Sequence, residues 1–194
     1  LEMAEKTGTL LRSQSYISDV RIWNGKDTIA HNLDTFRTVG NPTKENLTDL
    51  HLRAVGIGAA EQQCHKNNAW LTVPALITPG KDVVFQRTPR RRNPHFSWKQ
   101  IYDEYRDRAV LVGIREEQAL FEREVGPIDC FRPHDFLEMA SLIRGSHVFV
   151  GNSSCGAAMA EGMKHQNMIV EVYPQNPTGV FARDGARYCA RYPQ

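Results

Sequence analysis

The second half of the chain alternates short apolar runs with longer amphipathic segments. Buried strands are predicted by continuous apolar runs at 81–87, 109–113, 128–131, 147–151 and 167–174. Between these runs, apolar residues recur at helical spacing in 97–106, 115–126 and 134–146, and a helix of small residues is predicted after residue 154. Strands that alternate with helices in this way form a parallel sheet covered on both faces. The sequence therefore predicts an α/β fold with a doubly wound, Rossmann-like parallel sheet.

The first half of the chain is less regular. Its apolar and β-branched residues predict strands within 16–23 and 27–36 and a short strand at 69–73. Leucines recur at helical spacing in 43–56, and Thr43 is the expected N-cap of that helix.

A segment rich in proline and bounded by Gly80, residues 74–80, has the composition of a linker. We therefore expect an N-terminal lobe over 1–77 and a C-terminal lobe over 78–194. The chain begins with Leu1 and continues directly into what resembles the middle of a domain. We expect that it lacks its native N-terminus and that the first lobe is partial.

Composition narrows the class of protein. Of the 194 residues, 41% are hydrophobic and 24% are charged, as in ordinary globular proteins, and a net charge of +2 gives no indication of nucleic acid. No apolar run approaches the roughly 18–20 residues of a membrane helix, and the start has no signal-peptide pattern. Widely spaced cysteines without a CxxC pair favour free thiols over disulfides. We expect a cytoplasmic protein with no membrane span, cofactor or metal.

One predicted strand ends abruptly in a polar turn, where the sequence reads Gly-Asn-Ser-Ser-Cys-Gly before the small-residue helix begins. In an open α/β sheet, ligands bind beyond the carboxyl ends of the strands, where the next helix presents unpaired N–H groups and a positive dipole end. Small side chains and hydroxyl groups there allow a phosphate to approach the backbone. The alternative is that a serine caps the helix and the glycines only permit close packing. The candidate phosphate-binding residues are Gly151, Asn152, Ser153, Ser154 and Gly156.

A loop rich in arginine follows the first strand of the same predicted sheet, at 86–93. The carboxyl ends of parallel strands meet at one edge, so this loop and the polar turn should lie on the same side. Arginine forks suit phosphate oxygens, and the candidate ligands here are Arg87, Arg90, Arg91 and Asn93. A solvated basic loop and a patch for nucleic-acid phosphates are the alternatives. The scarcity of aromatic residues among the arginines argues against nucleic acid as a partner.

One acidic residue joins the candidate site. Glu161 lies in the predicted small-residue helix, where its carboxylate could accept hydrogen bonds from ribose hydroxyls or simply face solvent. The sequence contains no Ser-His-Asp arrangement and no residues spaced as metal ligands, so no catalytic residue can be assigned from it.

These segments resemble sugar-nucleotide enzymes that have the two-lobed GT-B fold. Residues 145–164 resemble the nucleotide-diphosphate loop in the C-terminal lobe of such enzymes, and the Gly-Asn-Ser-Ser-x-Gly core is similar to that of hydrolysing UDP-N-acetylglucosamine 2-epimerases. The wider pattern is more similar to glycosyltransferases related to the heptosyltransferases of lipopolysaccharide assembly. It combines 83–98, 109–113, 138–154 and a strand ending at 172–174. The likeness extends over about residues 10–174.

The resemblance implies a GT-B type C-terminal lobe facing a partial N-terminal lobe. A nucleotide-diphosphate sugar would place its diphosphate at 151–154 and Arg87, and an acceptor (a glycan, a lipid or a protein) would lie against the N-terminal lobe. The implied reaction is metal-independent sugar transfer, in which positive charge stabilises the departing diphosphate.

Two departures from the family pattern leave other functions open. The first β-α units, which carry an early glycine-rich loop and the catalytic base, are missing, and 153–155 lacks the Gly-Pro/His pattern of authentic heptosyltransferases. One alternative is an epimerase that acts on a UDP-sugar. The other is a catalytically inactive GT-B-like module that serves as a binding or structural part of a larger assembly.

Overall fold

The fold is built on one parallel sheet. The computed structural model describes residues 2–173, 175 and 178–191. In these residues six parallel strands form the order β3-β2-β1-β4-β5-β6. Their bounds are Val83–Gln86 (β1), Ala109–Val112 (β2), Cys130–Phe131 (β3), Val148–Asn152 (β4), Met168–Glu171 (β5) and Ala186–Cys189 (β6). The strand order reverses between β1 and β4, as in sheets that bind dinucleotides.

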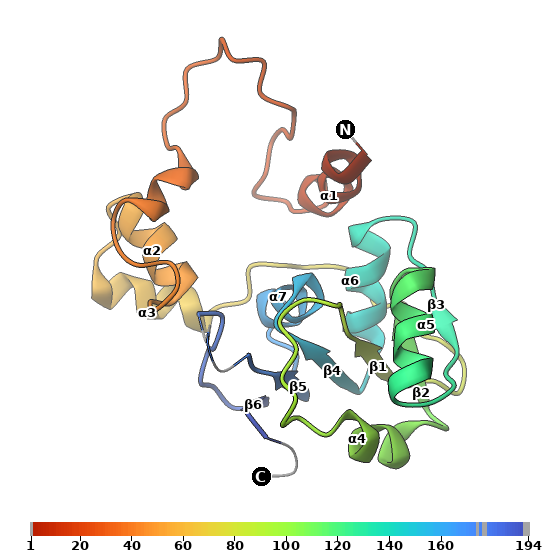
Figure 1. Cartoon of the computed structure of the whole chain (residues 1–194). Coiled ribbons are helices and arrows are strands. Elements are labelled where there is room, and N and C mark those ends of the chain that lie inside the picture. Colours follow the sequence, from red (N-terminus) through yellow and green to blue (C-terminus); the bar gives the residue numbers. More distant parts are fainter. Residues whose placement is uncertain (1, 174, 176–177, 192–194) are drawn as a thin grey trace.

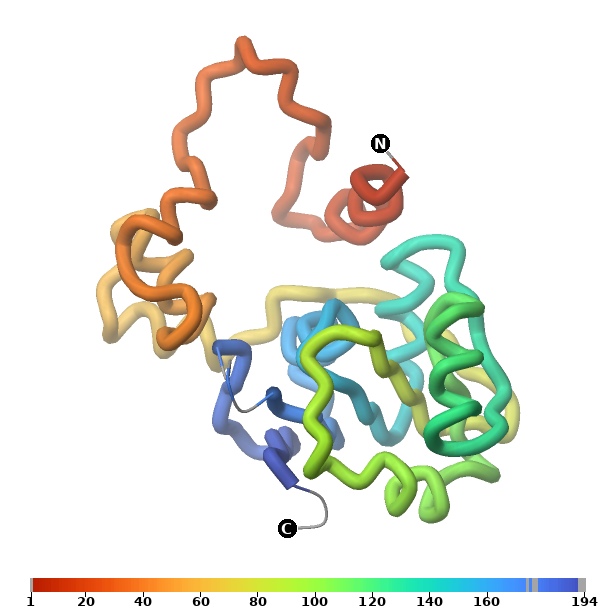
Figure 2. The backbone as a smooth tube through the Cα atoms, in the orientation of Figure 1, coloured from red at the N-terminus to blue at the C-terminus, as the bar shows by residue number. Residues whose placement is uncertain are grey.

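Helices cover both faces of the sheet, as the tubes and ribbons of Figures 1 and 2 show. Side chains alternate along each strand, so Val84 faces one apolar cluster while Val83 and Phe85 face the other. The first cluster contains residues of α1 (Glu2–Arg12), α6 (Phe136–Gly145) and α7 (Cys155–Gly162), and the second contains residues of α4 (Trp98–Tyr105) and α5 (Arg115–Glu124). The predicted doubly wound α/β fold is confirmed.

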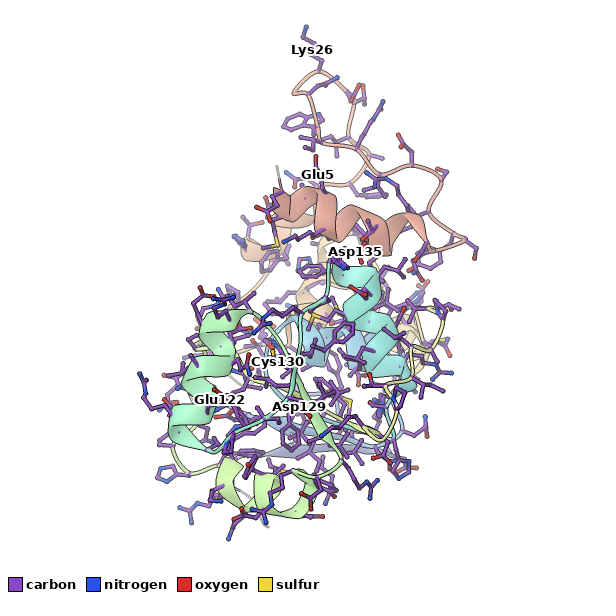
Figure 3. All side chains as sticks on the ribbon, turned by 90° about the vertical axis from the view of Figure 1, so that its right-hand side faces the viewer. Glu5, Lys26, Glu122, Asp129, Cys130 and Asp135 are labelled. Atoms are coloured by element: carbon purple, nitrogen blue, oxygen red, sulfur yellow. The ribbon has the colours of Figure 1, made fainter. Side chains whose placement is uncertain are left out.

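The strands predicted in the first half are wrong. Within the described residues, 16–32 form no helix or strand, and a short 3-10 helix, η1 (Leu33–Arg37), follows. Figure 3 shows Lys26 at the tip of this extended segment, away from the sheet. A β-branched pattern makes a strand only where a neighbouring strand supplies backbone partners, and none lies beside these residues. At 69–73 the backbone bonds instead to the end of α7, where the Leu71 N–H donates to the Gly162 carbonyl.

Two further helices, α2 (Leu47–Ala54) and α3 (Ala59–Asn67), form a small unit beside the sheet (Figure 1). The predicted helix at 43–56 exists, but it begins later than expected. Its N-cap is Asn46, whose side chain accepts from the Thr48 N–H, while Thr43 bonds to Asn41 in the preceding turn. The sequence interpretation did not include α1, α3 or β6. Pro174, the end of one predicted strand, and Leu1 lie outside the described residues.

The segment between the two halves is packed against the sheet domain. The Leu76 N–H donates to the Ser141 carbonyl on α6, and Leu10 of α1 shares a buried cluster with Leu71. The division into 1–77 and 78–194 stays a prediction. No helix in the described part of the chain is long and apolar enough to cross a membrane.

His165 joins α7 to β5 and is buried. Its Nε2 lies 3.1 Å from the Ser146 carbonyl oxygen, and its Nδ1 accepts from the Asn167 N–H at 3.2 Å. Both bonds are satisfied by the neutral ring with its proton on Nε2. Burial lowers the pKa of His165, and neighbouring positive charges add to this effect.

We expect the free energy of unfolding to fall as the pH falls below about 6.5. At that pH, His165 binds a proton in the unfolded chain but stays neutral in the folded protein. His165→Asn keeps an acceptor for the Asn167 amide and should flatten this dependence. Urea unfolding between about pH 5 and 8 measures it. The control is His31→Asn, since His31 is exposed. An unchanged slope in His165→Asn would assign the dependence to other groups.

Candidate functional site

A cavity of about 400 Å³ lies where the strand order reverses. Its polar side contains Thr88, Arg90 and Arg91 from the loop after β1 together with Ser153, Ser154 and Cys155 at the start of α7. Its apolar side contains Leu47 of α2, Trp70, Phe181 and Tyr188. The loop after β1 and the polar turn after β4 therefore meet at one edge, as the sequence predicted.

Asn152, at the end of β4, joins these two segments. It is fully buried, and its Oδ1 accepts from the Thr88 N–H at 3.1 Å. Its Nδ2 donates to the carbonyl oxygens of Thr88 at 3.1 Å and Arg90 at 2.6 Å. All of these bonds are made to the arginine loop, so Asn152 positions the loop and has no exposed group for a ligand.

Arg91 adopts a backbone conformation that is uncommon for a residue with a side chain. Its φ is +55°, in the left-handed region, which costs of order 1–3 kcal/mol and persists only where the surroundings impose it. The neighbouring carbonyl of Arg90 is held by Asn152, and the Arg91 Nη1 donates to the Ser153 carbonyl at 3.3 Å. The Arg90 and Arg91 side chains are exposed and line the cavity, so their positive charges are available to a ligand at this edge of the sheet.

The two serines shape the turn with their hydroxyl groups. Ser153 Oγ donates to the Glu171 carbonyl at 3.2 Å, and Ser154 Oγ donates to the Gln86 side chain. A hydroxyl has one proton, so neither serine keeps a donor for an anion in this arrangement. The glycines serve close packing: a Cβ at Gly156 would lie 2.9 Å from Gln86 Oε1, and one at Gly151 would meet the Phe149 ring at 2.6 Å.

The amino end of α7 remains as a group of donors at the cavity. Ser154 is the N-cap residue, yet its side chain makes no capping hydrogen bond to the first amides of the helix. The first turn, which begins at Cys155, also contains no acidic residue. The first N–H groups of a helix have no partner within it, and together with the positive end of the helix dipole they favour an anion here.

Arg87 and Asn93 do not reach the cavity. The Arg87 side chain is 10% exposed and lies on the face of the sheet that α5 covers. Its Nη1 is 2.9 Å from Glu124 Oε2, and its Nε is 3.5 Å from Glu171 Oε2. Burial lowers the pKa of Arg87, and the two carboxylates oppose this effect. Asn93 is buried, and its Nδ2 donates to the carbonyls of Val172 and Ala190. Through these contacts, both residues hold the arginine loop against the sheet domain on the side away from the cavity.

Glu161 lies on the cavity wall, but its oxygens are already paired. Oε1 is 2.5 Å from Lys164 Nζ, and Oε2 is 2.8 Å from Arg183 Nε and 3.5 Å from the Tyr188 hydroxyl. Burial and the nearby Glu161 carboxylate raise the pKa of Tyr188, so its hydroxyl stays neutral. Glu161 thus joins α7 to the loop before β6. In this arrangement it is neither the solvated residue nor the free ribose ligand that the sequence suggested.

Sequence reasoning missed the apolar side of the cavity. Leu47 and Thr48 were interpreted as part of a longer helix and Trp70 as a strand residue, while Phe181 and Tyr188 belong to a region that was left unassigned. The available signal was Trp70 itself, since a tryptophan in a short segment beside a linker has few places to be buried. Among the described residues no group of three or more His, Cys, Asp and Glu side chains could hold a metal ion, and the cysteines are free thiols.

Comparison with known proteins gives a weak match to a solved structure. No family model matches the chain, and no curated protein matches it. A crystal structure of a glycosyl transferase family 9 protein from Veillonella parvula aligns with a TM-score of 0.45 at 12% identity, over 74% of this chain and 48% of that protein. The chain thus spans about half the length of that protein.

Proposed function

We propose that the cavity binds a nucleotide-diphosphate sugar and that the chain takes part in transfer of the sugar to an acceptor. The observation that carries this proposal is the convergence of Arg90 and Arg91 with the amino end of α7, where the N-cap side chain makes no capping bond. These are two sources of positive potential at the edge of a parallel sheet where nucleotides bind. The volume of about 400 Å³ lies within the range of small-molecule sites.

Sugar transfer breaks the bond between the anomeric carbon and a diphosphate oxygen, and the bonding electrons leave with the diphosphate. Arg90 and Arg91 would stabilise the negative charge that develops on this group, and the amides of α7 would donate to its oxygens. The acceptor hydroxyl oxygen would form the new bond to the anomeric carbon, and its proton would leave to solvent. In the proposed arrangement 1–77 is the acceptor side and 78–194 is the nucleotide lobe, and the cytoplasm is the compartment.

The double variant Arg90→Ala/Arg91→Ala should bind UDP and ADP about 100-fold more weakly or worse, because charge-assisted bonds to phosphate contribute roughly 1.5–3 kcal/mol each. Isothermal titration calorimetry measures the change. Arg21→Ala is the matched control, since Arg21 is exposed on the extended segment. Equal affinity in the double variant and the parent would contradict the site.

Turnover distinguishes sugar transfer from the two alternatives. An epimerase converts a UDP-sugar without an acceptor, and the Gly-Asn-Ser-Ser core favours this reaction. An inactive module binds the nucleotide without turnover, and the internal pairing of Glu161 and of the serine hydroxyls favours it. Incubating the protein with a nucleotide sugar, alone and with an acceptor panel, separates these outcomes when products are resolved by mass spectrometry.

A further inference from the structure

Trp70 is a large apolar side chain left exposed on a cavity wall. It follows α3, and the residue is 49% exposed although it lines the cavity. Each Å² of apolar surface in contact with water costs about 25 cal/mol relative to burial. An indole in this position therefore gains stability when a flat apolar group covers it.

The position of Trp70 is fixed before any ligand arrives. Its backbone N–H donates to the Gly162 carbonyl at 2.8 Å, and its backbone carbonyl accepts from the Tyr16 hydroxyl at 2.5 Å. The indole lies so close to Gly162 that a Cβ there would be 2.8 Å from Cε2. The next residue, Leu71, is buried in the core. The anchored backbone and the contact with Gly162 restrict the indole, which lowers the conformational entropy it loses when a ligand stacks on it.

Arg90, Arg91 and the start of α7 form one end of the cavity, where an anion would bind, and Trp70 lies at the other end. Helix α7 extends from one end to the other. Cys155 and Glu161 both line the cavity, and the helical rise of 1.5 Å per residue separates them by about 9 Å along the axis. Ala157 and Ala158 line the stretch between them with small side chains, which leave room for a ligand. A ribose can bridge this distance when a diphosphate lies at Arg90 and Arg91 and a base lies near Trp70.

We propose that Trp70 is the stacking residue for the nucleotide base and that the first half of the chain thereby supplies part of the nucleotide site. This inference rests on the proposed function, because the diphosphate end fixes which part of the ligand reaches Trp70. Phe181 and Tyr188 line the same cavity, and the Tyr188 hydroxyl lies beside Glu161, so both can add aromatic surface near the base. Stacking is tolerant of the base, so purine and pyrimidine nucleotides both bind.

The test uses tryptophan fluorescence in a Trp23→Phe background. Trp23 is exposed on the extended segment and Trp98 is 3% exposed, so Trp70 is the exposed tryptophan of this variant. We expect UDP and ADP to quench its emission with saturation, while inorganic pyrophosphate binds without quenching. A sugar ring can also stack on an indole, so glucose 1-phosphate is titrated in parallel. Quenching by glucose 1-phosphate without quenching by UDP or ADP would overturn the proposal.

Affinity provides the second measurement. Trp70→Ala should weaken UDP and ADP binding by about tenfold or more and leave pyrophosphate affinity unchanged, because stacking of a base on an aromatic ring contributes roughly 5- to 150-fold. Trp70→Phe should restore most of the loss, and Trp23→Ala is the control for an exposed tryptophan elsewhere. An equal loss for pyrophosphate and UDP, or no loss for either, would overturn the role of Trp70. Absence of pyrophosphate binding to the parent would overturn the proposed function and this inference with it.

Discussion

Replacing Glu171 by alanine should lower the free energy of unfolding by about 3–5 kcal/mol, because it leaves a buried cation without part of its counter-charge. Glu171 is fully buried at the end of β5. Its Oε1 accepts from the Asn93 N–H at 2.5 Å, and its Oε2 accepts from Trp98 Nε1 at 2.7 Å and lies 3.5 Å from Arg87 Nε. Alanine removes all three contacts at once. Chemical denaturation monitored by circular dichroism measures the loss.

Two control variants separate charge from packing in this result. Glu122→Ala removes a carboxylate from the exposed face of α5 and should change stability by no more than about 0.5 kcal/mol. Glu171→Ala combined with Arg87→Met removes both charges, and the double variant should recover part of the stability lost in Glu171→Ala. A loss below about 1 kcal/mol in Glu171→Ala would show that the buried pair contributes little.

The sheet was predictable because each central strand is a continuous apolar run. Val83, Val84 and Phe85 are buried on both faces, and this leaves no polar alternation to confuse with a surface strand. Two of the helices between the strands begin at polar residues whose side chains cap them, Ser97 before α4 and Asp135 before α6. Local signals and tertiary packing agree over this part of the chain, which is why the prediction succeeds there.

The first half was less predictable because its structure depends on contacts that the sequence does not display. Residues 16–23 have the composition of a strand, but a strand also needs a neighbour with free backbone groups. In α2 the cap moved from Thr43 to Asn46, whose Nδ2 donates to the Val180 carbonyl far along the chain. A contact across such a sequence separation decides a boundary that local patterns leave open.

At the candidate site, the edge was predictable and the roles of individual residues were not. Parallel strands place the loops after β1 and β4 side by side whatever their side chains are. Whether an arginine faces the cavity or the core depends on its partners, and Glu124 and Glu171 bind Arg87 from other elements. For the same reason Asn152 was interpreted as a ligand residue, whereas its amide is used within the fold. Pairing between distant segments determines which polar groups are available to a ligand.

Asn152→Ala should have the second large effect, because it disturbs both stability and the site. The Thr88 N–H and the Thr88 and Arg90 carbonyls lose their partner, and each of these partly buried hydrogen bonds contributes about 0.5–1.5 kcal/mol. We expect a loss of about 2–3 kcal/mol in the free energy of unfolding. The matched control is Asn24→Ala, since Asn24 uses its side chain in an exposed turn and its loss should be small.

The same variant tests whether Asn152 positions the arginines. Without the bond to the Arg90 carbonyl, the backbone at Arg91 loses a contact that accompanies its left-handed conformation, and the two side chains no longer converge at α7. We therefore expect UDP affinity to fall about tenfold in Asn152→Ala at temperatures where the variant is folded, as an oriented charge-assisted contact contributes about 1.4 kcal/mol or more. Calorimetry on samples whose folding is verified by circular dichroism measures this. Lower stability with unchanged UDP affinity would mean that Asn152 supports the sheet but does not hold the arginines in their binding arrangement.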